Sequence, residues 1–412
     1  MKKFVLLILV FNFTLLHSQS KNLTIEDIIF YSNSSLAPTN LSQINFIKGT
    51  NYFYYIENNT LILNNDKSEI NTLITLDKLN NLFKIQNFST IKNFPKIDFL
   101  SLNTFVFSNN NTYFSYNTET DSLSKLYSLP SEAENIEMSE DYSTAVFTLD
   151  NNVYFSLNGN IAQLSNEKNQ NIIYGHSVHR NEFGIEKGIF LSPNAKLVAF
   201  YRMDQTMVTD YPILDIDSLP AQVRSVKYPM AGGKSHEVTI GVYNSLTKNI
   251  VYLETGPQKE QYLTCVTWSP DNQFIFVAIL NRDQNHMDLC KFDAISGKKI
   301  KTLFSEDDNK FVEPEHPLYF LSGNNNKFIW SSKRDGWNHL YIYDTDGNLI
   351  NQLTKGQYEI TEIIGFDEKN KNLFYISTEK TPLERHLYKI NINTLKAECL
   401  TNSSGMHDII FS

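Results

Sequence analysis

The chain has 412 residues, of which 41% are hydrophobic and 20% charged, so it can bury a large core. Its formal net charge is −9, and the sequence contains no basic stripe. This charge balance argues against nucleic acid or an anionic membrane as a partner. With 28 Phe and 22 Tyr but only 16 Gly, the composition favours β-strands over helices.

The N-terminus is typical of an export signal. Lys2 and Lys3 precede an apolar run over residues 4–16, and small polar residues follow at Ser18 and Ser20. The apolar run has about 13 residues, whereas a helix that spans a bilayer needs about 20. We therefore predict a signal peptide over residues 1–20 and export to the periplasm, the cell surface or the medium. A retained membrane anchor is the less favoured alternative.

The cysteines and histidines give no sign of a metal or cofactor site. Cys265, Cys290 and Cys399 cannot all pair internally. A bridge between Cys265 and Cys290 is one interpretation, because they fall in neighbouring predicted strands, but buried free thiols are favoured. His176 and His179 have ligand-like spacing without a third ligand, so structural histidines are expected, with neither metal nor cofactor.

After residue 50 the sequence repeats as strand–turn–strand units. In the clearest series Tyr243, Phe292, Tyr343 and Ile390 occupy equivalent positions, separated by 49, 51 and 47 residues. Fainter copies upstream bring the number of predicted hairpins to seven. Periods near 50 residues with several strands per unit are typical of a β-propeller. The predicted fold class is therefore all-β, with a propeller over residues 51–412.

Turn residues separate the predicted strands. Asn158-Gly159 and Asp346-Gly347 suit tight hairpins, because these pairs accept positive φ angles. The sequences Ser192-Pro193-Asn194 and Ser269-Pro270-Asp271 fall where one strand ends and the next begins, and in each the proline fixes φ. An apolar strand follows each of these turns, as expected for successive strands of one blade.

One insertion interrupts the repeat between Gly159 and Tyr243. It carries Glu182 just ahead of a predicted blade strand, and then a long excursion over residues 204–235. Excursions of this kind within repeat arrays usually form a binding face or an interface; a solvent-exposed loop is the alternative. A carboxylate at the mouth of a propeller can capture a cationic group such as the α-ammonium of a peptide. For an arbitrary glutamate, however, an exposed or salt-bridged side chain is the usual role.

The end of the sequence has the pattern of an incomplete repeat. Residues 405–412 resemble the entry strand of a further blade, without the strands that would complete it. Because open sheet edges are normally covered, this pattern predicts a truncated last blade. The alternative is that the segment pairs elsewhere and the propeller is closed.

Several motifs resemble the N-terminal propeller of the dipeptidyl peptidase IV family, within the prolyl oligopeptidase clan, and in particular its secreted bacterial dipeptidyl and prolyl tripeptidyl peptidases. The matching stretches include His179-Arg180-Asn181-Glu182-Phe183-Gly184-Ile185, Phe200-Tyr201-Arg202-Met203-Asp204, Tyr228-Pro229-Met230-Ala231-Gly232 and Arg334-Asp335-Gly336-Trp337. The resemblance implies an eight-bladed propeller that caps an α/β-hydrolase domain. It also implies that residues 21–50 pack on that hydrolase domain rather than on the propeller.

The resemblance implies a role for the insertion as well. Acidic residues there hold the free amino terminus of a peptide, and the enzyme releases Xaa-Pro dipeptides or tripeptides that end in proline. Glu182 matches the acidic position, but its neighbour is Asn181 where the best-known members have a second glutamate. No arginine precedes Arg180, so the role of an early-blade arginine cannot be transferred. The expected substrate-binding residues are Glu182, Asn181, Arg180 and Tyr211.

No catalytic residue is expected in this chain. It contains no G-x-S-x-G sequence, the usual signature of a serine hydrolase nucleophile. We therefore predict a substrate-gating propeller that does not cleave peptides by itself. Its expected partners are a peptide with a free N-terminus, an α/β-hydrolase domain and, in a homodimer, a second copy of the chain. A non-catalytic scaffold that binds a protein or peptide is the alternative function, and glycan binding through the aromatics ranks third.

Overall fold

A computed structural model describes residues 22–31, 36, 41–67 and 69–411 of the chain. The predicted signal peptide, residues 1–20, lies outside these described residues. The chain divides into two units, residues 1–42 and 43–412. The first contains a short π-helix, η1 (Asp27–Tyr31), at whose start Thr24 and Asp27 exchange side chain–backbone hydrogen bonds of 3.0 and 3.1 Å. Among the described residues, no helix has the length and apolarity needed to cross a bilayer.

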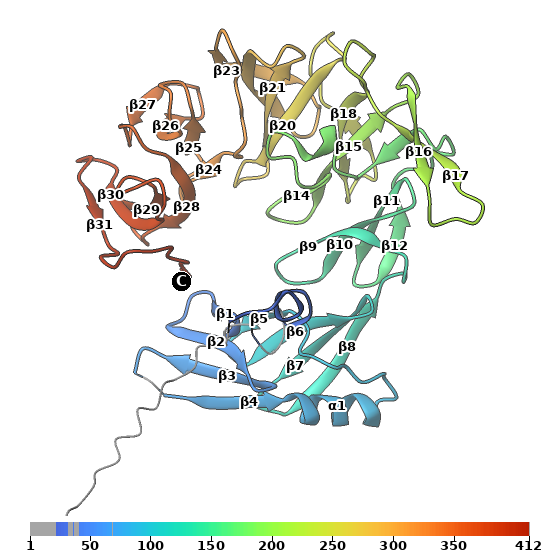
Figure 1. The fold of residues 1–412 in the computed structure, drawn as a ribbon, viewed down its shortest axis with the longest axis vertical. Helices are drawn as coiled ribbons and strands as arrows, with labels where there is room; N and C mark the ends of the chain where they lie inside the picture. The colour runs from blue at the N-terminus through green and yellow to red at the C-terminus, as the bar shows by residue number, and fades with distance from the viewer. Residues whose placement is uncertain (1–21, 32–35, 37–40, 68, 412) are drawn as a thin grey trace, which may run out of the picture. The chain divides into compact units, whose positions relative to one another are not determined.

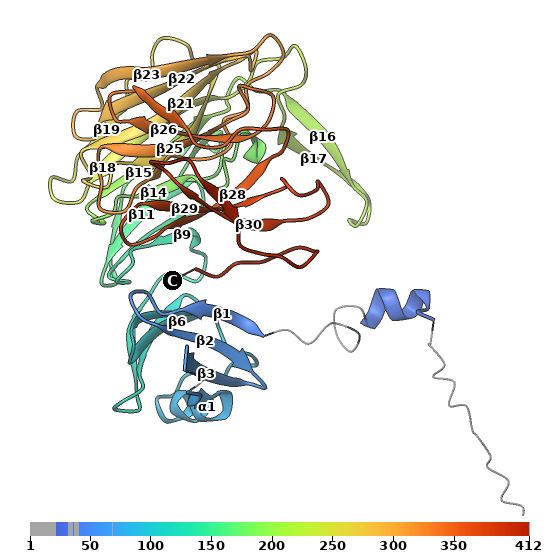
Figure 2. The same cartoon turned by 90° about the vertical axis from the view of Figure 1, so that its left-hand side faces the viewer.

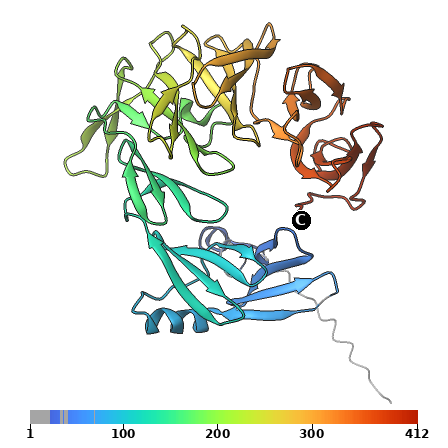
Figure 3. The same ribbon diagram turned by 180° about the vertical axis from the view of Figure 1, so that it is seen from behind.

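The second unit is a β-propeller whose sheets follow one another in chain order around a common centre (Figures 1 and 3). The first three sheets are β1–β4, β5–β8 and β9–β12. Their strands are β1 (Ser42–Phe46), β2 (Tyr52–Glu57), β3 (Thr60–Asn65), β4 (Asn71–Thr75), β5 (Ile97–Ser101), β6 (Thr104–Asn109), β7 (Thr112–Asn117), β8 (Ser122–Ser128), β9 (Glu134–Met138), β10 (Thr144–Leu149), β11 (Asn152–Leu157) and β12 (Asn160–Gln163). One helix, α1 (Leu76–Ile85), follows β4.

The fourth sheet differs from the others because it has five strands and carries a separate hairpin. Its strands are β13 (Ile172–Tyr174), β14 (Ile189–Leu191), β15 (Leu197–Asp204), β18 (Glu237–Asn244) and β19 (Ile250–Tyr252). Between β15 and β18 the chain forms an arm, the two-stranded hairpin of β16 (Asp210–Asp215) and β17 (Gln222–Lys227). Figure 2 shows this arm extending away from the sheets.

The last three sheets again have four strands each. Their strands are β20 (Gln261–Trp268), β21 (Phe274–Asn281), β22 (His286–Asp293), β23 (Lys299–Asp307), β24 (Tyr319–Phe320), β25 (Lys327–Ser332), β26 (His339–Asp344), β27 (Leu349–Gln352), β28 (Ile360–Phe366), β29 (Asn372–Ser377), β30 (His386–Asn391) and β31 (Ala397–Cys399). In each of these sheets the first strand lies nearest the centre and the last strand at the periphery (Figure 1).

The propeller prediction is confirmed, but the expected eight blades are wrong for the described residues, which form seven. The count of seven hairpins came from the repeat itself, whereas the eighth blade came from the family resemblance and the C-terminal pattern. Residues 405–411 do not form the expected entry strand. Met406 makes an isolated parallel bridge to Arg385, and the Phe411 ring packs 5.1 Å from that of Phe374. The segment therefore lies along the seventh sheet, which has four strands, and the described residues do not show a truncated blade.

The local signals in the repeat are confirmed. Tyr243, Phe292, Tyr343 and Ile390 all lie in the third strand of their blade and pair with the fourth. Asn158 and Gly159, with φ angles of 48° and 81°, form the two-residue turn between β11 and β12. Both Ser-Pro turns connect the innermost strand of a blade to the next strand.

Aromatic side chains fill the space between neighbouring sheets. Phe105, Phe107, Phe114 and Tyr116 are almost fully buried in a cluster shared by the first two blades. Burying rings of this size supplies much of the hydrophobic free energy of folding. The three cysteines are free, and Cys265 and Cys290 are buried, as the favoured interpretation predicted. The abundance of Phe and Tyr is therefore explained largely by blade packing.

Candidate functional site

The segment that carries Glu182 is a tight turn between β13 and β14. His179, Arg180, Asn181, Phe183 and Gly184 all have φ angles between 51° and 67°. Residues other than glycine pay about 1–2 kcal/mol each for this left-handed conformation. Such strain persists only where surrounding contacts enforce it, and it concentrates at functional sites.

Backbone and side-chain hydrogen bonds enforce the turn. The backbone N–H of Glu182 donates to the carbonyl of His179 at 3.1 Å, and that of Ile185 donates to the Glu182 carbonyl at 3.2 Å. The Ser177 hydroxyl donates to Asn181 Oδ1. The turn also packs closely against the loop before β24, since a Cβ atom on Gly184 would lie 1.9 Å from the carbonyl oxygen of Glu315. Only glycine fits at position 184.

A buried pair of histidines anchors the turn to the blade. His179 Nδ1 lies 2.9 Å from His236 Nε2, and the His179 ring packs 4.7 Å from the ring of Tyr262 on β20. Burial, together with the neighbouring His236 and Arg282, holds the pKa of His179 well below its usual value. Burial and the charges of Arg282 and Arg180 lower the pKa of His236 to about 4. Both imidazoles are therefore neutral near pH 7.

The other predicted site residues are held by structural contacts. The Arg180 guanidinium lies 4.2 Å from the centre of the Tyr228 ring, a cation–π geometry. Tyr228 in turn packs 5.7 Å from Tyr211, at the base of the arm. Arg180, Asn181 and Glu182 are brought together by the turn, whereas Tyr211 reaches them only through Tyr228. Within the described chain, Asn181 Oδ1 is occupied by Ser177.

Glu182 is exposed, and within the described residues its carboxylate has no hydrogen-bond or ion-pair partner. A carboxylate without a partner, held on a rigid turn, is ready to accept charge-assisted hydrogen bonds from a cation. His176 differs from Glu182 in having a partner, because its Nε2 lies 2.9 Å from the carbonyl oxygen of Asp150. No group of three His, Cys, Asp or Glu side chains within the described ranges could hold a metal ion.

A cavity of about 930 Å³ is lined in part by Gly184, which follows Glu182 by two residues. We call it the recess. Gly184 and Ile185 line it, together with residues of β14, of β20 and of the loop over residues 315–318. Its volume falls in the range of small-molecule and peptide-binding pockets.

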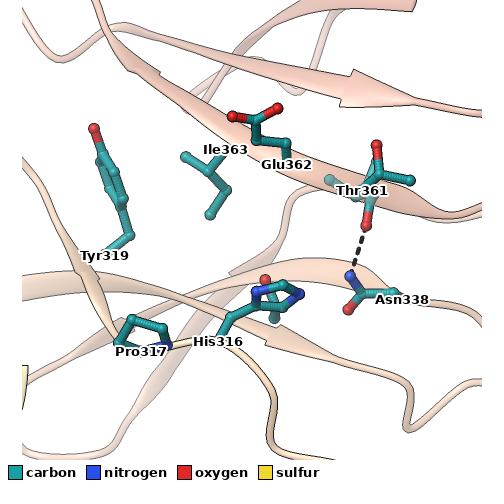
Figure 4. Close-up of a pocket in the computed structure, with 9 residues that line it drawn as sticks. His316, Pro317, Tyr319, Asn338, Thr361, Glu362 and Ile363 are labelled. Carbon is teal, nitrogen blue, oxygen red and sulfur yellow. Dashed lines mark hydrogen bonds between the residues drawn. The ribbon is translucent and has the colours of Figure 1, made fainter. Parts of the chain in front are cut away.

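A smaller pocket of about 220 Å³ adjoins the same loop on the side of the sixth and seventh blades. Figure 4 shows His316 and Pro317 on one wall, facing Glu362 and Ile363 of β28 on the other. The Asn338 amide donates to the Ile360 carbonyl at 2.6 Å and ties the two blades together at this point. Because His316 and Pro317 line both cavities, this loop forms a shared wall between the recess and the smaller pocket.

Sequence reasoning missed His236, Tyr262 and the recess. His236 lies 57 residues from its partner His179, so no local pattern connects the two. Trp268 directly precedes the predicted Ser269-Pro270-Asp271 turn, but its position on the recess wall depends on how β20 packs against β14. These contacts become visible only once the blades are assembled.

The fold and the turn define a β-propeller whose insertion presents, beside a cavity, the Glu182 carboxylate, which has no partner among the described residues. The sequence matches the family "Dipeptidyl peptidase IV (DPP IV) N-terminal region" over residues 99–412, and the chain belongs to this family. Among curated proteins it is 28% identical over 301 residues to a probable dipeptidyl-aminopeptidase B of Phaeosphaeria nodorum. It is 22% identical over 416 residues to a probable dipeptidyl peptidase 4 of Aspergillus flavus.

Solved structures agree with the fold. A putative dipeptidyl aminopeptidase IV from Bacteroides ovatus superposes with a TM-score of 0.83 at 31% identity, covering 92% of this chain and 55% of that one. Porphyromonas gingivalis dipeptidyl peptidase 4 superposes with a TM-score of 0.72 at 21% identity, covering 90% and 54%. The match covers 65% of this chain and 33% of the Phaeosphaeria protein, and 93% and 53% for the Aspergillus protein. The chain thus spans between a third and about half of its curated relatives.

Proposed function

We propose that this chain is the substrate-gating propeller portion of an exported serine exopeptidase, and that Glu182 binds the α-ammonium of the peptide substrate. The observation that carries the proposal is the exposed Glu182 carboxylate, which has no partner in the described part of the chain. It lies on a turn that backbone hydrogen bonds and a buried histidine pair hold in a left-handed conformation. A hydrogen-bonded ion pair between this carboxylate and an ammonium positions the peptide without taking part in bond cleavage.

The chemistry of cleavage is proposed to reside in an α/β-hydrolase domain outside these 412 residues. The chain contains no G-x-S-x-G sequence, and the relatives it matches are named as dipeptidyl peptidases. Anchoring the amino terminus at Glu182 sets which bond reaches the nucleophile, and so releases Xaa-Pro dipeptides or tripeptides ending in proline. The purified chain is expected to leave a proline-containing chromogenic peptide intact; hydrolysis that Glu182→Ala abolishes would contradict this.

The amino-terminal anchor is tested by calorimetric titration of a peptide with a free amino group and of its N-acetylated counterpart. The native chain should bind the free peptide about tenfold more tightly or better, because charge-assisted hydrogen bonds contribute about 1.5–3 kcal/mol. Glu182→Gln should remove this preference. Glu132→Gln, which neutralises an exposed and unpartnered carboxylate elsewhere in the described chain, should leave it unchanged. Equal binding of both peptides by the native chain would contradict the proposal.

The arm is proposed to contact a second copy of the chain. Leu214, Ile216, Leu219 and Val223 are 60%, 73%, 96% and 66% exposed, an unusual concentration of apolar side chains on a two-stranded hairpin. Sedimentation should show a dimer for the native chain and a monomer for Leu219→Asp. A monomeric native chain at micromolar concentration would contradict this part of the proposal.

A further inference from the structure

The recess has a mainly apolar wall in an unusual position. Residues of β14 and β20 form part of it, and these are the innermost strands of the fourth and fifth blades (Figure 1). The apolar side chains that line it include Phe190, Leu191, Val266, Trp268, Pro317 and Leu318. A cavity of about 930 Å³ holds more than one side chain, so it has room for part of a peptide.

A bulge in β20 shapes this wall. The pairing of β20 with β21 shifts between Thr264 and Thr267, and Cys265 adopts a φ angle of 54°. Bulges of this kind redirect side chains and are common beside binding sites. Trp268 Nε1 donates to the carbonyl of Phe190 at 3.0 Å, which occupies a backbone acceptor on β14. This acceptor of β14 is therefore not free to pair with an added strand.

The charged side chains that line the recess are three glutamates and Lys187, and one of the glutamates has no partner among the described residues. Lys187 is paired with Glu137, and Glu315 lies 3.2 Å from Lys333. Glu140 is paired with Lys48 at 3.0 Å. Glu186 is exposed, and its carboxylate has no ion-pair or hydrogen-bond partner within the described part of the chain. A ligand with its own carboxylate would be repelled here, whereas an apolar group would not.

The recess lies within reach of a peptide anchored at Glu182. Gly184, which lines it, follows Glu182 by two residues, so their Cα atoms are at most about 7.6 Å apart. An extended peptide advances about 3.3 Å per residue, so a stretch of three residues is longer than this Cα–Cα distance. Because side chains alternate along an extended chain, successive residues cannot both enter the recess.

We infer that the recess is a side-chain specificity site for peptides held at Glu182, and that it selects a large apolar residue near the amino terminus and excludes acidic ones. The inference rests on the proposed function, because it takes Glu182 as the anchor. The occupant is a peptide with a free amino group and a bulky apolar side chain at its second or third position. The apolar wall provides the binding energy, and Glu186 provides the selection against carboxylates.

The experiment titrates the native chain with four hexapeptides that have free amino termini. They carry Ala at positions two and three, Phe at position two, Phe at position three, or Asp at whichever of these positions prefers Phe. One of the two Phe peptides should bind about tenfold more tightly than the Ala peptide, because burying a phenyl ring contributes about that much. The other Phe peptide should bind like the Ala peptide, and the Asp peptide should bind more weakly.

Three variants, one of them a control, locate the effect. Leu191→Trp fills the recess and should abolish the Phe preference, while Leu157→Trp adds the same side chain at an exposed leucine of β11 and should not. Glu186→Lys, an exposed change that does not threaten folding, should strengthen binding of the Asp peptide relative to the native chain. Thermal unfolding of each variant confirms that the propeller is intact.

The two proposals fail in different ways. Equal binding of the Phe and Ala peptides, or a Phe preference that survives Leu191→Trp, would overturn the specificity site even if acetylation still weakens binding. Loss of the acetylation effect with a retained, Leu191-dependent Phe preference would instead overturn the role of Glu182. Absence of binding for every peptide up to millimolar concentration would contradict both.

Discussion

The fifth blade and the insertion of the fourth blade are built on opposite principles. Across β20, β21 and β22 buried residues dominate, and each strand of this blade pairs with the next along the chain. In the insertion, five of the six residues from His179 to Gly184 have left-handed backbone angles, and the arm exposes apolar side chains. The blade is stable through its own packing, whereas the turn depends on contacts with distant residues. The residues that depend most on their surroundings are those that carry the proposed function.

The largest expected effect comes from replacing the glycine on which the turn depends. Gly184→Ala should destabilise the protein by about 4 kcal/mol or more, because the new Cβ atom meets the Glu315 carbonyl and φ is 67°. Gly232→Ala is the matched control: its φ is 76° but no atom lies within 4 Å of the new Cβ, so only about 1 kcal/mol should be lost. Urea unfolding measures both; similar losses would show that the contact with Glu315 does not support the turn.

The histidine pair should make stability depend on pH. Because the folded-state pKa of His236 lies near 4, the unfolded chain takes up the proton first as the pH falls below 6.5. The contribution of the neutral pair is therefore complete above pH 6.5 and is lost as the pH falls towards 4. Between pH 7.5 and 5 the loss from His236 should be about 2 kcal/mol.

Replacing His236 by glutamine isolates this effect. In His236→Gln the change in unfolding free energy between the two pH values should shrink by most of that amount. His286→Gln should alter this pH-dependent change in the opposite sense. Hydrogen bonding to Asp307 raises the pKa of His286, so the stabilisation that the protonated His286 provides is lost as the pH rises. An unaltered pH slope in His236→Gln would show that the pair is not buried and neutral.

The smallest effect concerns the link between the turn and the arm. Arg180 and Tyr228 should couple by about 0.5–1 kcal/mol, the usual size of an exposed cation–π contact. A double-mutant cycle with Arg180→Met and Tyr228→Leu, read by chemical unfolding, gives this coupling directly. A coupling energy of zero would mean that the arm and the turn are independent.

The two regions also differ in how far the sequence predicts them. Strand pairing within a blade is local, so the spacing of Tyr243, Phe292, Tyr343 and Ile390 was enough to predict the repeating hairpins and the fold class. The blade number is not set by local sequence, and the expectation of eight blades, taken from the resemblance, differs from the seven that the described residues form. The signal peptide over residues 1–20 stays a prediction.

The site was predicted only in part for the same reason. Arg180, Asn181 and Glu182 are consecutive, so a single motif places them together. The support of the turn is spread over the chain: His236 follows the arm, Tyr262 belongs to the next blade, and Glu315 lies in a loop beyond it. Contacts of such high sequence separation leave no periodic signal, and neither does a cavity formed between two blades.

The central claim, that Glu182 holds a peptide ammonium, is tested most directly by the pKa of the bound α-amino group. A peptide labelled with ¹⁵N at its amino terminus reports this pKa in an NMR titration of the complex. A carboxylate within hydrogen-bond distance should raise it well above the ordinary value of about 8, and Glu182→Gln should return it to that value. The same α-amino pKa in the native and Glu182→Gln complexes would contradict the account.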